Sequence, residues 1–286
     1  MDYSDNTSRA STPDSLFDDI SDPVFHDAVS GPSQTRSTDG DVDLEAFPAH
    51  REAPPIPGLY FEPDVRLPVE LAKETMDECL ETYFKNSNVN QVMLFGRAKR
   101  GDQVETSNCG LPKFLQSLLD DLEGFLKPML PQKTHRLLFP PPDEAVHARQ
   151  AIINLYHPGE GISPHVDLLR RFGDGIIGVS LGSGCVMNFC HVPGDGDASS
   201  SLDAPSACPG PDIRDKRWDL YLPERSVLVL SEDARYRWTH GIERRTKDLV
   251  KSEDARGRQW IDRSLRISIT FRWLLPGADI VGGEDI

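Results

Sequence analysis

The chain has 286 residues and a net charge of −15, with 38% hydrophobic and 27% charged side chains. This composition supports a packed core, although not over the whole length. No apolar run reaches the ~20 residues that a membrane-spanning helix needs, and the first thirty residues lack the basic start and apolar stretch of a secretory signal. The sequence therefore argues against an integral membrane protein and against a Sec-exported one.

The negative charge is concentrated near the N-terminus. Residues 1–53 hold twelve acidic and three basic side chains, and the remaining 233 residues carry a net charge of only −6. Proteins bind nucleic acids nonspecifically through lysine and arginine side chains that neutralise phosphates. The charge balance therefore disfavours a broad nucleic-acid surface, but it leaves room for a local basic patch.

Residues 1–53 are rich in Ser, Asp, Thr, Pro and Gly and contain few large apolar residues. They cannot bury enough surface to offset the entropy of ordering, so we expect a disordered acidic tail followed by one domain over residues 54–286. Residues 15–20 contain a leucine, a phenylalanine and an isoleucine among acidic side chains. Two interpretations remain open: three incidental apolar residues, or a motif that docks a protein partner and folds on binding.

Five cysteines are scattered along the chain without a Cys-x-x-Cys pair: Cys79, Cys109, Cys185, Cys190 and Cys208. An odd, scattered set predicts free thiols in a reducing compartment rather than a disulfide framework or a zinc finger. We therefore expect an intracellular protein, located in the nucleus and/or the cytoplasm.

The predicted domain begins with helices and continues with strands. Apolar residues at helical spacing predict helices over residues 67–84 and 111–126. From residue 148, short apolar or alternating runs predict strands over residues 151–156, 175–181, 185–190, 219–222, 226–230 and 265–273. Gly182, Ser183 and Gly184 suit a hairpin turn between the second and third of these strands. Many short strands without intervening helices indicate an antiparallel sandwich or barrel.

Two candidate metal ligands, His165 and Asp167, stand two residues apart in the β region. Side chains at this spacing project from one face of an extended strand. His240 is the candidate third ligand, because it lies in a later part of the β region. Two histidines and one carboxylate that leave three coordination positions open are typical of non-haem Fe(II) oxygenases.

Two arginines near the C-terminus, Arg266 and Arg272, are six residues apart and so share one face of the last predicted strand. An arginine that faces a sheet interior needs an anionic partner. Because guanidinium groups bind carboxylates in a bidentate manner, this pair indicates a buried anionic ligand. Asn154 and Tyr156 also share a strand face and offer hydrogen-bond donors near the same place.

These residues, in this order, resemble the AlkB family of Fe(II)/2-oxoglutarate dioxygenases over about residues 56–275. The motifs that carry the resemblance are Asn154-x-Tyr156, His165-x-Asp167, His240, and Arg266 followed by Arg272. Residues 158–162, 180–183, 225–230 and 235–242 are similar to the tRNA wobble-uridine hydroxylase branch of that family. The resemblance implies an α+β fold: a double-stranded β-helix, or jelly roll, with N-terminal helices packed on one sheet.

The resemblance also implies three cofactors, Fe(II), 2-oxoglutarate and O₂, and three iron ligands, His165, Asp167 and His240. Arg272 belongs to this catalytic set, because it would lie near the iron-side carboxylate of 2-oxoglutarate and hold Asp167 in orientation. In such enzymes the oxidative decarboxylation of 2-oxoglutarate to succinate and CO₂ is coupled to hydroxylation of a C–H bond.

The other binding residues follow from the same resemblance. Arg266, together with Arg272, would bind the carboxylates of 2-oxoglutarate, and Asn154 and Tyr156 would add hydrogen bonds. In this family the segment between the helices and the jelly roll forms a lid over the substrate. Basic and aromatic residues gather there in this chain and are the candidate substrate contacts: Phe95, Arg97, Lys99 and Arg100.

The preferred hypothesis is a dioxygenase that oxidatively demethylates or hydroxylates a modified nucleobase, with tRNA or DNA as the partner and no role for a membrane. Demethylation and stable hydroxylation differ only in whether the new hydroxyl-bearing carbon is attached to nitrogen, and the sequence does not choose between them. One alternative keeps the chemistry but places it on a protein side chain or a small molecule. The other is a catalytically idle binding module whose acidic tail recruits partners.

Overall fold

The computed structural model describes residues 47–86, 88–96, 110–141, 144, 147–193, 217–254 and 256–278. Most of the predicted acidic tail, including residues 15–20, lies outside these residues. Within the described part of the chain, no helix is both long and apolar enough to cross a membrane.

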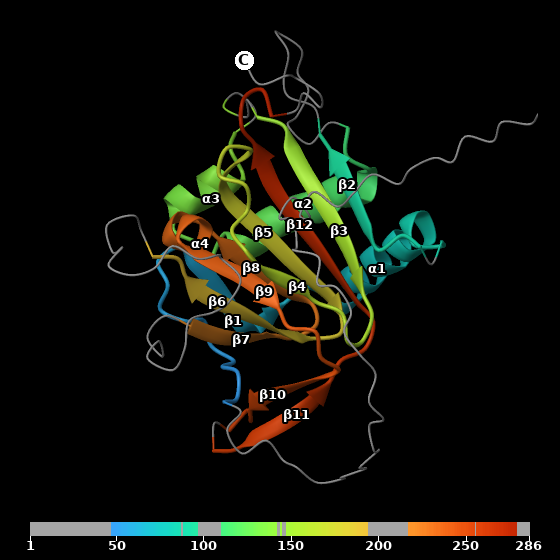
Figure 1. The fold of residues 1–286 in the computed structure, drawn as a ribbon. Helices are drawn as coiled ribbons and strands as arrows, with labels where there is room; N and C mark the ends of the chain where they lie inside the picture. Colours follow the sequence, from blue (N-terminus) through green and yellow to red (C-terminus); the bar gives the residue numbers. More distant parts are fainter. Residues whose placement is uncertain are drawn as a thin grey trace, which may run out of the picture. The chain divides into compact units, whose positions relative to one another are not determined.

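The larger of two main sheets has six antiparallel strands in the order β1-β8-β5-β12-β3-β2 (Figure 1). The strands are β1 (Leu59–Arg66), β2 (Gln91–Phe95), β3 (Arg149–Tyr156), β5 (Phe172–Gly182), β8 (Ser226–Leu230) and β12 (Arg266–Leu274). All of them except β1 and β2 coincide with strands predicted from the apolar runs. The central position of β12 explains why its side chains are buried on both faces.

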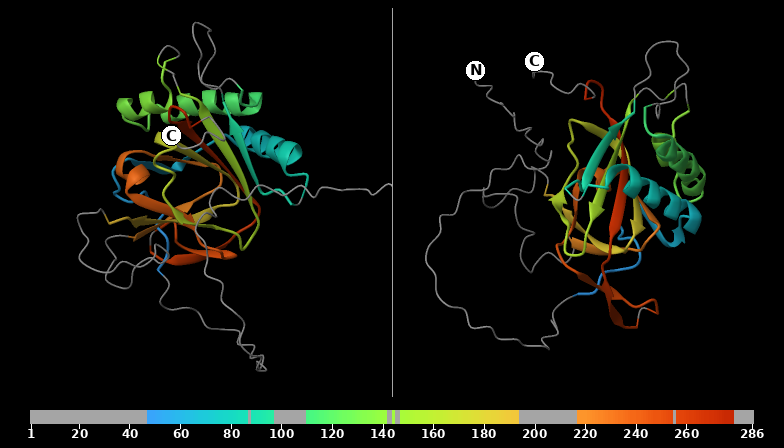
Figure 2. Two further views of the ribbon diagram at one scale, coloured as in Figure 1. Left: turned by 45° about the horizontal axis from the view of Figure 1, so that its top comes forward. Right: turned by 90° about the vertical axis from the view of Figure 1, so that its right-hand side faces the viewer.

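The outer face of this sheet is covered by helices. Alternate residues of β12, namely Ile267, Ile269 and Phe271, join the leucines of the helices in one apolar cluster. The helices are α1 (Val69–Tyr83), α2 (Lys113–Leu126) and α3 (Gln132–Leu138), and Figure 2 shows α1 and α2 on one side of the sheet. The two helices predicted from their apolar stripes are thus confirmed as α1 and α2, whereas α3 was not predicted because it is only seven residues long.

The second main sheet has four antiparallel strands in the order β4-β9-β6-β7. These strands are β4 (Ile162–His165), β6 (Cys185–His191), β7 (Arg217–Leu222) and β9 (Trp238–Ile242), and the short helix α4 (Glu232–Tyr236) directly precedes β9. Phe189 and Leu220 of this sheet pack against Ile176, Leu228 and other inner-face residues of the six-stranded sheet. Two antiparallel sheets therefore face each other across a shared core, which confirms the predicted α+β jelly-roll fold with helices on one sheet.

The predicted hairpin at Gly182–Gly184 was wrong. β5 pairs with β8 and β12, whereas β6 pairs with β7 and β9, so the turn carries the chain from one sheet to the other. Gly182 has a φ of +78°, and Ser183 donates its backbone N–H to Leu265 O at 3.0 Å. The turn residues were recognised correctly, but which sheet each strand joins depends on distant partners.

The predicted tail boundary falls inside a packed segment. Ala49 is 1% exposed, and its backbone pairs with β10 (Lys247–Lys251), a strand that forms a two-stranded sheet with β11 (Arg258–Asp262). His50 pairs on its other side with β7 through two hydrogen bonds of 2.8 Å. Residues 47–53 thus belong structurally with the domain rather than with the tail, because they join β10 to the edge of the four-stranded sheet.

This packing generates the first prediction. A chain that starts at residue 54 loses four backbone hydrogen bonds made by Ala49 and His50, and its unfolding free energy should fall by about 2–5 kcal/mol. A chain that starts at residue 47 should keep the stability of the full chain. Denaturant unfolding of the three chains measures both effects. Equal midpoints for the two truncated chains would contradict the prediction.

Candidate metal and carboxylate site

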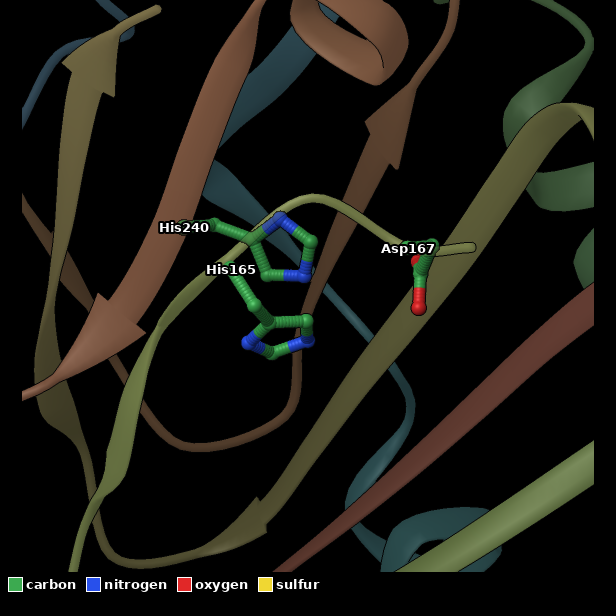
Figure 3. A group of neighbouring side chains, drawn as sticks. All are labelled: His165, Asp167 and His240. Carbon is green, nitrogen blue, oxygen red and sulfur yellow. The ribbon is translucent and has the colours of Figure 1, made fainter. Parts of the chain in front are cut away.

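Three side chains predicted as metal ligands meet at one end of the jelly-roll interior. One ligand atom from each of His165, Asp167 and His240 lies within 4.8 Å of the others, and Figure 3 shows the two imidazole rings next to each other with the Asp167 carboxylate to one side. His165 ends β4 and pairs directly with His240 of β9. Asp167 lies beyond the end of β4, so the cluster does not rest on the strand alternation from which the sequence argument started.

The two histidine rings are held by different surroundings. The Nδ1 of His165 lies 2.9 Å from the carbonyl oxygen of Ser163; a carbonyl only accepts, so Nδ1 is the donor and Nε2 is the nitrogen that would bind a metal. Burial, with the neighbouring His165 adding to its effect, lowers the pKa of His240 to about 4. The His240 ring is therefore neutral near pH 7, as a metal ligand must be.

The carboxylate of Asp167 is held by an ion pair. Arg272 of β12 donates to Asp167 Oδ1 and, at 2.7 Å, to Gln150 Oε1 on the adjacent strand β3. Burial by itself raises the pKa of Asp167, but the Arg272 guanidinium together with the other groups around the carboxylate holds that pKa below its usual value. Burial also lowers the pKa of Arg272, to about 10, which still leaves it charged at neutral pH.

The donor set fits a divalent iron ion. It consists of two imidazoles and one carboxylate, which would hold Fe(II) and leave coordination positions for further ligands. The predicted meeting of His165, Asp167 and His240 is thus seen in the structure, and so is the contact between Arg272 and Asp167.

Arg266 lies farther along the same inner face of β12 and is 5% exposed. Its Nη2 donates to Ser180 Oγ at 3.0 Å, and its guanidinium carbon is 5.3 Å from the centre of the Tyr156 ring. Its Nε and Nη1 are buried and have no hydrogen-bond partner among the described residues. A small cavity lined by Tyr156, Cys185, Ile242 and Arg266 opens beside it.

Unpaired donors on a buried guanidinium are costly, so this cavity suits an anion. A carboxylate would accept from Nε and Nη1, and the Tyr156 hydroxyl stands nearby as a second donor, since burial raises the pKa of Tyr156 and keeps it protonated. The arrangement fits one carboxylate of 2-oxoglutarate.

The structure describes only two of the remaining predicted site residues, Asn154 and Phe95. Asn154 lies on the same face as Tyr156, but its Oδ1 accepts a hydrogen bond of 2.7 Å from Gln91 Nε2 of β2, a partner that was not predicted. Phe95 ends β2 and is 37% exposed. The candidate substrate contacts Arg97, Lys99 and Arg100 lie outside the described residues.

Sequence reasoning missed a second buried ion pair beside the cavity. Arg263 donates to both carboxylate oxygens of Asp248 at 2.6 and 2.8 Å, and also to the Glu243 carbonyl oxygen at 2.7 Å. It thereby fixes the chain just beyond the end of β9, the strand that carries His240. No local pattern signals this pair, because its two members lie on a hairpin that the apolar runs did not predict.

Comparison with known proteins accounts for this geometry. The family model described as the 2OG-Fe(II) oxygenase superfamily matches residues 76–272, which include all three candidate ligands and both arginines of β12. This chain belongs to the 2OG-Fe(II) oxygenase superfamily. Fe(II), 2-oxoglutarate and O₂ are accordingly its cofactors, and they supply the oxidising chemistry when bound.

Individual relatives point to AlkB-type proteins, as the sequence motifs indicated. An uncharacterized protein of Acanthamoeba polyphaga mimivirus is 35% identical over 162 residues, which are 57% of this chain and 58% of that protein. The tRNA (carboxymethyluridine(34)-5-O)-methyltransferase alkbh8 of Xenopus tropicalis is 36% identical over 133 residues, 43% of this chain and 18% of that protein. The chain thus spans less than two thirds of the length of these relatives.

Among solved structures, that of OsALKBH1 covers 76% of this chain and 98% of its own chain, with 14% identity and a TM-score of 0.39.

The second prediction concerns the metal ligands. His165→Ala and His240→Ala should each abolish metal binding and all 2-oxoglutarate turnover, with or without substrate, because a three-ligand site loses its geometry when one ligand is removed. Metal titration and succinate release measure the two effects. Asp167→Ala should do the same but should also destabilise the chain by about 3–5 kcal/mol, since it leaves Arg272 buried without its carboxylate.

A half-exposed histidine on α3, His135, supplies the control. His135→Ala should bind metal and turn over 2-oxoglutarate as the unaltered chain does. Full turnover by His240→Ala would show that the third ligand is misassigned.

The third prediction concerns Arg266. Arg266→Ala removes the donors that face the cavity, an interaction worth roughly 2–5 kcal/mol, so the apparent constant for 2-oxoglutarate should rise on the order of tens-fold or more. Metal affinity should remain, because Arg266 does not contact the three ligands. Arg258→Ala, an exposed substitution on β11, is the control and should leave the constant unchanged. An unchanged constant in Arg266→Ala would contradict the assignment.

Proposed function

We propose that this chain is a 2-oxoglutarate-dependent dioxygenase that oxidises a modified nucleobase in nucleic acid, with tRNA as the first candidate substrate. The observation that carries the proposal is the cluster of His165, Asp167 and His240, which contacts one arginine of β12, Arg272, while the other arginine on the same face of β12, Arg266, has unpaired guanidinium donors. One constellation suits a metal, the other suits a carboxylate, and both lie within one jelly-roll interior.

In this proposal the residues of the chain divide the work. His165, Asp167 and His240 hold Fe(II), and Arg272 keeps the Asp167 carboxylate ionised and in place. Arg266 and Tyr156 bind the far carboxylate of 2-oxoglutarate, and Asn154 adds a hydrogen bond from its amide. The apolar half of the interior, formed around Phe189 and Leu228, excludes water from one side of the site.

The surface beside the metal ligands supports a nucleic-acid substrate. Leu168 and Leu169, which directly follow Asp167, are 50% and 55% exposed, and Tyr236 is 40% exposed. Arg170 and Arg237 are exposed next to them in the chain. Apolar and aromatic side chains together with arginines suit unstacked bases and phosphates.

The lid over the substrate is a second part of the proposal. Phe95 would pack against the substrate, while Arg97, Lys99 and Arg100 would contact phosphates. The printed name of the Xenopus tropicalis relative places that protein on carboxymethyluridine in tRNA, which is why tRNA is tested first.

The compartment and a protein partner are also proposals. The described cysteines Cys79 and Cys185 are buried free thiols, which supports a reducing compartment such as the nucleus or cytoplasm. A protein partner for the acidic tail would bind residues outside the described part of the chain.

The fourth prediction tests the substrate class. The full chain, supplied with Fe(II) and labelled 2-oxoglutarate, should release succinate faster with modified tRNA than without substrate, and the His240→Ala variant should not. Panels of alkylated DNA and of peptides run beside the tRNA panel. Stimulation by DNA alone would move the substrate to DNA, and stimulation by peptides alone would overturn the nucleobase proposal. Metal binding without turnover on any panel would favour an idle binding module.

A further inference from the structure

Arg235 is a buried arginine whose hydrogen-bond acceptors among the described residues are all backbone carbonyls, while its guanidinium carbon lies 4.8 Å from the centre of the Tyr236 ring. It lies in α4, is 2% exposed, and forms no ion pair with a carboxylate among the described residues. Its guanidinium donates to Asp167 O and Phe172 O at 3.0 Å and to Gly173 O at 3.2 Å, with a longer contact of 3.5 Å to Leu168 O.

Two of these acceptors, the carbonyls of Asp167 and Leu168, lie in the link between β4 and β5, and the other two, of Phe172 and Gly173, stand at the start of β5. Residues 166–171 belong to neither strand, so no sheet ladder fixes the main chain at Asp167. Buried carbonyls without ladder partners must find donors elsewhere. A guanidinium, with five N–H groups in a rigid fork, is well suited to serve several carbonyls at once.

The position of Arg235 joins this link to the other ligand-bearing element. α4 leads directly into β9, and Arg235 stands five residues before His240. The side chain therefore bridges the main chain at Asp167 and the segment that carries His240. The pairing of His165 with His240 fixes those two ligands to each other, but it does not reach Asp167.

We propose that Arg235 is a positioning residue for the metal centre: by binding the carbonyl of Asp167 it sets where the carboxylate ligand stands relative to His240. The inference rests on the proposed metal ligands. Arg272 binds the side-chain carboxylate of Asp167, and Arg235 donates to the backbone carbonyl oxygen of the same residue. Two arginines, one from helix α4 and one from strand β12, thus hold one ligand residue at its backbone and at its side chain.

A matched control exists in the same molecule. Arg149 is also about 2% exposed, donates to the carbonyl oxygen of Leu138, and lies 3.8 Å from the centre of the Trp273 ring. It is a buried guanidinium on a backbone carbonyl, but it lies beside α3 and contacts no predicted ligand. Loss of Arg149 therefore measures the general effect of removing a buried cation.

The test compares Arg235→Met with Arg149→Met in the full, metal-free chain, with Co(II) as the probe. Co(II) affinity, unfolding free energy and amide exchange of residues 167–173 are measured for each variant. Both variants should lose stability. Only Arg235→Met should weaken Co(II) binding, by about tenfold or more, and speed exchange in the 167–173 segment.

The conservative pair Arg235→Lys and Arg149→Lys keeps the test decisive where a methionine variant fails to fold. Lysine keeps the charge but reaches fewer carbonyls, so Arg235→Lys should show a smaller loss of Co(II) affinity and Arg149→Lys none. Equal Co(II) affinity in the Arg235 and Arg149 variants would overturn the positioning role alone. Failure of the unaltered chain to bind Co(II) would overturn the proposed metal site as well.

Discussion

The ion pair between Asp167 and Arg272 holds the two halves of the site together. Asp167 follows the end of β4 in the four-stranded sheet, and Arg272 stands on the central strand of the six-stranded sheet. An uncompensated charge in this interior would be strongly unfavourable, so each partner requires the other. The same contact that allows both charges to be buried also holds the Asp167 carboxylate beside His165 and His240. The contact between Asp167 and Arg272 therefore determines both the charge balance of the site and the position of its carboxylate ligand.

The other buried arginines show how this chain handles the same problem in different ways. Arg263 is neutralised by both oxygens of Asp248, whereas Arg235 is surrounded by backbone carbonyls. Arg266 differs from both, because two of its nitrogens meet no acceptor among the described residues. Partners supplied by the chain indicate a structural or positioning role, whereas the unpaired donors of Arg266, which lines a cavity, indicate a ligand. This contrast separates the carboxylate site from its supports without reference to any bound molecule.

The parts of the fold that could be predicted are those governed by local periodicity. The helices over 69–83 and 113–126 follow from apolar stripes, and the shared face of Arg266 and Arg272 follows from the two-residue period of a strand. Local sequence does not determine which sheet a strand joins. The turn at Gly182 was therefore predicted correctly, but it was interpreted as a hairpin and not as a connection between the two sheets. Residues 47–53 were assigned to the tail from their composition. The residue with which Ala49 pairs, Val250, lies some 200 residues later in the chain, so no local pattern reveals that pairing. The ligand set was found from residue types and the family resemblance, but Asp167 reaches it from a loop that Arg235 and Arg272 hold.

Strand β12 shows why core and site can share one element without conflict. Its odd-numbered residues from Ile267 to Phe271 pack under the helices, and its even-numbered residues from Arg266 to Arg272 face the jelly-roll interior. Because the period of a strand is two, a shift in register by one residue would bury both arginines under the helices and expose apolar side chains to the site. The apolar face therefore fixes the register that the polar face requires. The helices α1 and α2 contribute to the site through that register, although they contact neither the metal ligands nor Arg266.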